Sequence, residues 1–304
     1  MEKKGLTFVF LTALVSGISI FVNKFGVSDF NPYVYTFAKN IVVTVFIFSI
    51  LLLFKEEKIL RKLTRRQWCK LVVIGFTGGS IPFLLFFKGL TLTSGAMASF
   101  IHKTMFLYVG ILAIIFLKEK INRRILLATI LLLLGNALFL GFSPKTIGMG
   151  EMLIFIATLF WALENVISKY TLNELSPRVV GFGRMFFGSI FIFIFLNVTG
   201  QISELIILTT QQLSWILITS SFLFLYVILW YTGLKYVSVS VATMILLLGS
   251  PITTLLSMVF LGDTVTVSQA MGMFLILLGV IIVIELYGVL QSLKIYKNVR
   301  ARWS

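Results

Sequence analysis

Apolar residues occur along this chain in long runs that are separated by short polar segments. The runs are about 18–23 residues long, which is the length an α-helix needs to cross a hydrocarbon core of about 30 Å. They predict ten spanning helices, at residues 6–23, 33–54, 68–89, 95–117, 122–141, 149–168, 179–197, 213–234, 240–261 and 266–290. We therefore expect an all-α integral membrane protein without a separate soluble domain.

Composition supports this class and excludes others. Hydrophobic residues make up 59% of the 304 residues, well above the share in soluble domains. Cys69 is the single cysteine of the chain, so neither a disulfide framework nor a cysteine metal site is expected. The sequence suggests no cofactor and no catalytic motif.

The net charge of +15 is unevenly distributed along the chain. If the N-terminus is cytoplasmic, the inner segments hold 20 Lys and Arg residues and the outer segments hold 3. This bias follows the positive-inside rule and predicts a multi-pass cell-membrane protein with both termini in the cytoplasm. We expect the basic run from Lys55 to Lys70 to contact anionic membrane lipid, and we expect no nucleic acid partner.

The two halves of the sequence are related. The pairs 144 residues apart include Gly89 with Gly233, Ala98 with Ala242, Glu119 with Asp263 and Gly135 with Gly279, and the pairs 145 apart include Pro32 with Pro177 and Lys39 with Arg184. The repeat predicts two five-helix units, residues 1–144 and 145–304. An odd number of spans in each unit gives the second unit the opposite orientation in the membrane. Inverted repeats are typical of alternating-access transporters, which bind their solute between the repeats.

These segments resemble the EamA type of the drug/metabolite transporter superfamily. The resemblance rests on the ten-span layout, on GLTLTSGA at Gly89 and GLKYVSVSVA at Gly233, on FLKE and FLGD at helix ends, and on the LLG that closes each half. It implies two inverted five-helix repeats and transport of a solute, and family members carry amino acids, sugars, sugar nucleotides and phosphorylated metabolites. The family often has a proline midway along the fourth and ninth spans. Here Pro251 occupies the ninth span, but Leu107 stands in the fourth.

Three basic residues, Lys39, Lys103 and Arg184, lie too deep within predicted spans to belong to loops. Together they cost about 8–10 kcal/mol unless they face water, a partner or a ligand. A structural ion pair or snorkelling would satisfy them without any function. Because the repeat relates Lys39 to Arg184, we favour a role for these two in binding.

Helical spacing brings further polar residues to the same region. Trp161, Glu164, Asn165 and Ser168 follow i, i+3, i+4, i+7 and form one stripe, which lipid cannot solvate. The predicted solute-binding residues are Lys39, Asn40, His102, Lys103, Trp161, Glu164, Asn165 and Arg184. By depth they divide into an outer cationic layer (Lys39, His102, Lys103) and an inner layer (Glu164, Arg184), whose members are also candidate partners of each other.

The sequence therefore predicts a secondary transporter for a small organic solute, either an amino acid or another solute with a carboxylate or phosphate group. A channel is the alternative, and an intramembrane enzyme is less favoured because its motifs are absent. His102 could make transport depend on pH, since an imidazole ordinarily titrates near neutrality. The sequence leaves open the solute itself, the direction of transport, a coupling proton or ion and the oligomeric state. Separately, the segment GFTGG at Gly75–Gly79 is expected to allow close contact between helices.

Overall fold

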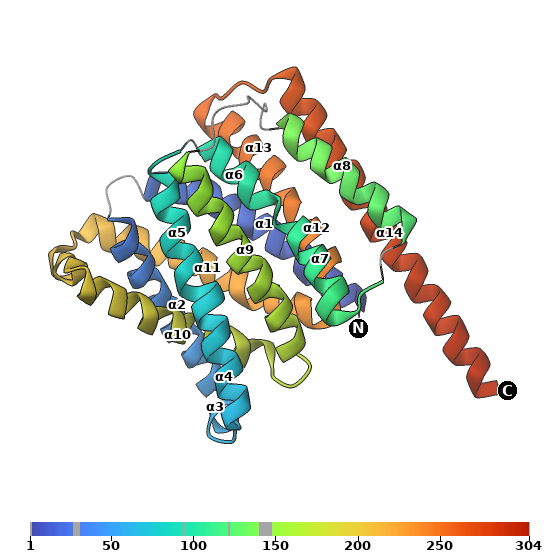
Figure 1. The fold of residues 1–304 in the computed structure, drawn as a ribbon, viewed down its shortest axis with the longest axis horizontal. Helices are drawn as coiled ribbons and strands as arrows, with labels where there is room; N and C mark the ends of the chain where they lie inside the picture. The colour runs from blue at the N-terminus through green and yellow to red at the C-terminus, as the bar shows by residue number, and fades with distance from the viewer. Residues whose placement is uncertain (1, 27–30, 94, 121, 140–147, 304) are drawn as a thin grey trace.

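The computed structural model describes residues 2–26, 31–93, 95–120, 122–139 and 148–303 (Figure 1). Across these ranges the chain is helical and contains no β-strand. Nine stretches of these ranges are long and apolar enough to cross a membrane: Lys3–Asn23, Pro32–Leu53, Arg65–Leu90, Phe100–Leu117, Met149–Thr171, Pro177–Val198, Thr210–Tyr236, Val239–Leu261 and Val267–Glu285. The all-α membrane class is thus confirmed.

The predicted fifth span, 122–141, corresponds to α8 (Arg123–Phe139). Its 17 residues end where the described range ends, so the count of ten spans stays a prediction. The proposed boundary between the repeats, 144/145, also falls outside the described residues. The helix α8 packs along α14 (Val267–Trp303), and this pair lies at one side of the bundle (Figure 1).

Two pairs of helices begin with equivalent capping residues. Asn31 caps α2 (Pro32–Leu53) and Ser176 caps α10 (Pro177–Val198), each just before a proline at the first helical position. The pairs Thr64–Gln67 and Thr209–Gln212 form capping boxes at the starts of α4 (Arg65–Ile74) and α11 (Thr210–Tyr236). In both cases the equivalent residues are 145 positions apart.

The fourth and ninth predicted spans are each interrupted. The fourth consists of α6 (Gly95–Lys103) and α7 (Met105–Leu117), which are separated at Thr104. The ninth span consists of α12 (Val239–Ile245), a 3₁₀ turn η3 (Leu246–Leu248) and α13 (Gly249–Leu261). Thr104 and Leu248 are 144 positions apart, so the two interruptions are equivalent in the repeat.

The third span contains an irregular turn. A π-helical segment η1 (Gly75–Ser80) joins α4 to α5 (Ile81–Leu90). A β-carbon on Gly79 would lie 2.2 Å from the carbonyl oxygen of Arg184, and one on Gly188 would lie 2.5 Å from that of Gly79. The expected close helix contact at GFTGG is therefore confirmed, with α10 as the partner.

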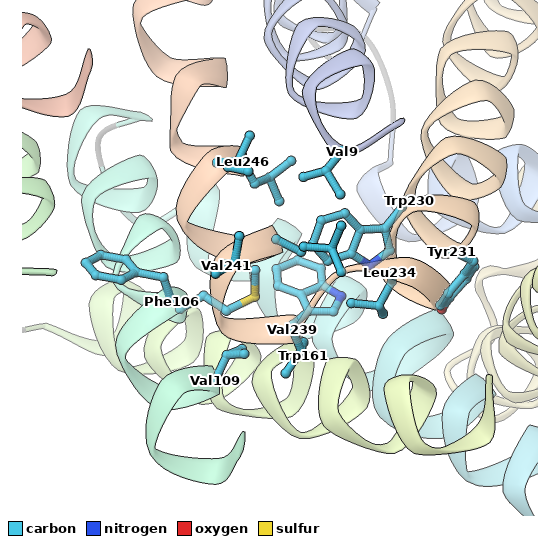
Figure 2. Packing of buried hydrophobic residues seen from close by; sticks show 14 of the residues in the cluster. Val9, Phe106, Val109, Trp161, Trp230, Tyr231, Leu234, Val239, Val241 and Leu246 are labelled. Carbon is cyan, nitrogen blue, oxygen red and sulfur yellow. The ribbon is translucent and has the colours of Figure 1, made fainter. Parts of the chain in front are cut away.

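The other helices complete the bundle around a shared core. The helix α1 (Glu2–Gly26) packs against α11 and α13, and α9 (Met149–Thr171) packs against α5 and α7. The short helices α3 (Glu57–Leu60) and η2 (Gln201–Ile207) connect spans. Figure 2 shows side chains from α1, α7, α9, α11 and α12 meeting in one buried cluster, so the core is built from both halves of the chain.

Candidate functional site

The helix α9 carries a carboxylate inside the bundle. Glu164 is 0% exposed, and its Oε1 accepts hydrogen bonds from Ser168 Oγ at 2.5 Å and from Tyr231 OH at 2.6 Å. Arg184 Nη1 lies 3.7 Å from the other oxygen, Oε2. Buried charges are found in proteins where partners of this kind compensate them. Glu164 and Arg184 are thus partners of each other, as their predicted depth allowed.

The irregular turn of the third span is held by side chains of the neighbouring helices. The carbonyl oxygen of Gly78 accepts hydrogen bonds from Arg184 Nη2 and from Trp161 Nε1, both at 3.2 Å. Pro82, four residues after Gly78, has no N–H to offer that carbonyl. Asn40 Nδ2 donates to the next carbonyl, that of Gly79, at 2.8 Å. Side chains from α2, α9 and α10 therefore satisfy backbone oxygens of this turn.

The absence of a side chain at Gly78 is required by Glu164. A β-carbon on Gly78 would lie 2.3 Å from Cγ and 2.9 Å from Cδ of Glu164. The turn and the carboxylate thus fit together only with glycine at this position.

Asn165 links α9 to α11. Its Oδ1 accepts from Trp230 Nε1 at 2.9 Å, and its Nδ2 donates to the carbonyl of Trp161 at 2.8 Å. Trp161, Trp230 and Tyr231 all belong to the buried cluster around the start of α12 (Figure 2). The polar stripe predicted on the sixth span therefore does face the interior of the bundle.

Lys39 lies in a separate network, although the repeat relates it to Arg184. Its Nζ donates to Asn23 Oδ1 at 2.8 Å and lies 4.7 Å from the centroid of the Tyr35 ring. Tyr35 OH lies 2.8 Å from Asn23 Oδ1 and from Thr219 Oγ1. The Lys39 side chain is nine-tenths buried, and the described contacts give it only neutral partners.

His102 and Lys103 end the helix α6. The His102 ring contacts two aromatic rings, with centroid distances of 4.9 Å to Trp161 and 5.6 Å to Phe86. Lys103 is 5% exposed, and none of the described residues forms a hydrogen bond or ion pair with its ammonium group. Ser99, on the same predicted stripe, has a side chain outside the described set.

The structure thus brings five of the predicted residues together around the turn of the third span, namely Asn40, Trp161, Glu164, Asn165 and Arg184. His102 touches this group through Trp161, whereas Lys39 has its own network. The sequence analysis did not identify the central role of Gly78 or the contact of Tyr231 with Glu164. Pro82 within an apolar span was the available signal for the first, because it predicts an unpaired carbonyl four residues earlier.

A family model described as the EamA-like transporter family matches residues 3–141 and 148–285. The chain belongs to the EamA-like transporter family. An uncharacterized transporter from Clostridium kluyveri is 26% identical over 299 residues, which cover 92% of this chain and 93% of that protein. The uncharacterized transporter YetK from Bacillus subtilis is 25% identical over 251 residues, or 80% of this chain and 76% of YetK.

One solved crystal structure is similar in fold, with a TM-score of 0.77 over 94% of this EamA-like transporter and 99% of the matched chain. At 14% sequence identity this similarity concerns the fold alone. The family match and the apolar helices together make the chain a multi-pass membrane transporter, and they point away from an enzyme.

Proposed function

We propose that this EamA-like transporter is a secondary transporter that moves a small organic solute by alternating access. The solute is an amino acid or another metabolite with a carboxylate or phosphate group. The observation that carries the proposal is the presence of two buried ammonium groups, Lys39 and Lys103, that no described carboxylate neutralises.

The energetic cost of these groups supports an anionic solute. A lysine at the centre of a spanning helix costs roughly 2.5–3.5 kcal/mol on insertion scales, so two cost roughly 5–7 kcal/mol. Arg184 does not add to this excess, because Glu164 compensates it. A negative group on the solute would offset part of the cost while it is bound.

Contacts between the two halves support alternating access. At the end of the bundle that holds Lys70, three contacts join the proposed halves: Lys70 Nζ with Glu174 Oε1 at 2.6 Å, Arg178 with Glu56, and Glu119 Oε1 with the N–H of Val239 at 2.9 Å. At the opposite end Asn31 Nδ2 donates to Gln201 Oε1 at 2.8 Å and Thr93 donates to Glu151. Rocking of one half against the other would break one set while the other set holds.

The orientation and the repeat boundary belong to the proposal as well. We place both termini and the Lys70 end in the cytoplasm of a cell-membrane protein, on the distribution of Lys and Arg along the chain. The repeats are residues 1–144 and 145–304, a division favoured by the helix caps and interruptions that recur 144 or 145 positions apart.

A coupling proton is part of the proposal through His102. Its ring contacts the rings of Trp161 and Phe86. The ion pair between Lys70 and Glu174 would not produce a dependence of transport on pH near neutrality. The hydrogen bond from Lys70 holds the pKa of Glu174 below its ordinary value, so this contact is complete at neutral pH and is lost only as pH falls through that lowered pKa.

Thermal stabilisation of the purified protein by a panel of metabolites tests the class of solute. A ligand present at 100 times its Kd raises the free energy of unfolding by about 2.7 kcal/mol. We expect solutes with a carboxylate or phosphate group to raise the melting temperature. Stabilisation only by solutes that lack both a carboxylate and a phosphate group would show that the assignment is wrong.

A further inference from the structure

The three basic residues within the spans have unequal surroundings. Arg184 has a carboxylate, a tyrosine hydroxyl and a backbone carbonyl as neighbours. Lys39 has Asn23 and the face of Tyr35. Lys103 is as deeply buried as the other two, yet the described part of the chain gives its ammonium group no hydrogen-bond or ion-pair partner. Of the three cations, Lys103 is therefore the one whose charge still needs a partner.

The described residues offer no second acid that serves Lys103. Of the 11 acidic residues, Glu164 and Glu285 lie deep within predicted spans, and Glu285 is exposed. Glu164 is already engaged by Arg184, Tyr231 and Ser168. No acid of the described residues therefore neutralises Lys103, which leaves this role open to a bound solute.

The fold itself does not require a charge at this position. Lys103 is the last residue of α6, directly before the interruption at Thr104. Its equivalent in the other half is Leu247, which lies in η3 at the equivalent interruption and is also buried. Since the second half builds the same feature with leucine, the ammonium group in the first half serves another purpose.

We propose that the ammonium group of Lys103 binds the carboxylate or phosphate group of the transported solute. The ring of His102, the residue before Lys103, contacts the rings of Trp161 and Phe86, and we expect this aromatic surface to contact the rest of the solute. Ammonium groups bind both anions as a point charge, so this site accepts either. The inference rests on the proposed function and deepens it, because it assigns the anionic group of the solute to Lys103 rather than to Lys39.

The test uses the full-length protein and the variant Lys103→Leu, which copies the residue of the other half. Lys88→Leu is the matched control, because it removes the same charge from an exposed position of α5. Without any solute, we expect Lys103→Leu to raise the melting temperature and Lys88→Leu to leave it unchanged. A fall in melting temperature for Lys103→Leu would mean that the ammonium group has a structural partner, and would overturn the proposal.

The second arm measures exchange of labelled succinate, glycerol 3-phosphate and glycerol by reconstituted protein. We expect succinate or glycerol 3-phosphate to exchange. The rate should be at least tenfold lower in Lys103→Leu and intermediate in Lys103→Arg, which keeps the charge. Equal rates in wild type and Lys103→Leu would overturn the proposal. So would exchange of glycerol alone, which carries neither a carboxylate nor a phosphate group, although the transport function would then stand. If no solute exchanges, the transport function fails, and the inference fails with it.

Discussion

Breaking the Glu164–Arg184 pair should destabilise the protein more than breaking any other ion pair of the described chain. Arg184→Met leaves the carboxylate of Glu164, which is fully buried, without its guanidinium, and the carbonyl of Gly78 loses one of its two donors. Removing one partner of a buried pair typically costs about 3–5 kcal/mol. We expect a loss of this size in the free energy of unfolding, measured by denaturant titration in mixed micelles.

A double-mutant cycle shows whether the cost comes from the pair. Adding Glu164→Gln to Arg184→Met removes the stranded charge, so the double variant should be more stable than the sum of the single losses predicts, by about 1–3 kcal/mol. The control cycle uses Arg178 and Glu56, whose side chains are 32% and 20% exposed and whose coupling should be about 0–1 kcal/mol. Additive losses for Arg184 and Glu164, within about 0.5 kcal/mol, would refute the view that the two groups compensate each other.

Three further outcomes follow from the same features. Gly78→Ala should lower the melting temperature, because the new β-carbon would lie 2.3 Å from Glu164 Cγ. The control Gly110→Ala should leave it unchanged, because a β-carbon there would have no neighbouring atom within 4 Å. Equal effects of the two substitutions would contradict the close fit between Gly78 and Glu164. A cysteine at Lys58, in a variant lacking Cys69, should react with an impermeant thiol reagent only after the membrane is opened, and labelling of intact cells would reverse the orientation. His102→Gln should flatten the dependence of transport on pH between about 5 and 8, and coincident profiles would exclude His102 as the proton-sensitive group.

The sequence predicted the all-α membrane class and suggested the repeat because both leave regular patterns along the chain. Apolar runs of spanning length and matches at offsets of 144 and 145 need no knowledge of packing. The pairing of Glu164 with Arg184 was also within reach, since both lie at a similar depth from the same membrane face. These inferences depend only on position along a helix.

Features that depend on contacts between helices were harder to predict. No glycine or proline lies within five residues of Thr104, so no helix-breaking residue marks the interruption there. Tyr231 is one of many aromatic residues in an apolar span, and only packing of α11 against α9 brings its hydroxyl to Glu164. The sequence suggested similar roles for Lys39 and Arg184, but the carboxylate that distinguishes them lies on a third helix.

Counterflow in proteoliposomes tests the central claim, transport of an anionic solute by alternating access, most directly. Vesicles are loaded with an unlabelled solute that stabilises the protein, and uptake of the labelled form is followed over time. A carrier that exposes one site to each side in turn predicts saturable uptake and transient accumulation of label above its equilibrium level, only in loaded vesicles. Uptake that neither saturates nor overshoots would show a channel and contradict the account.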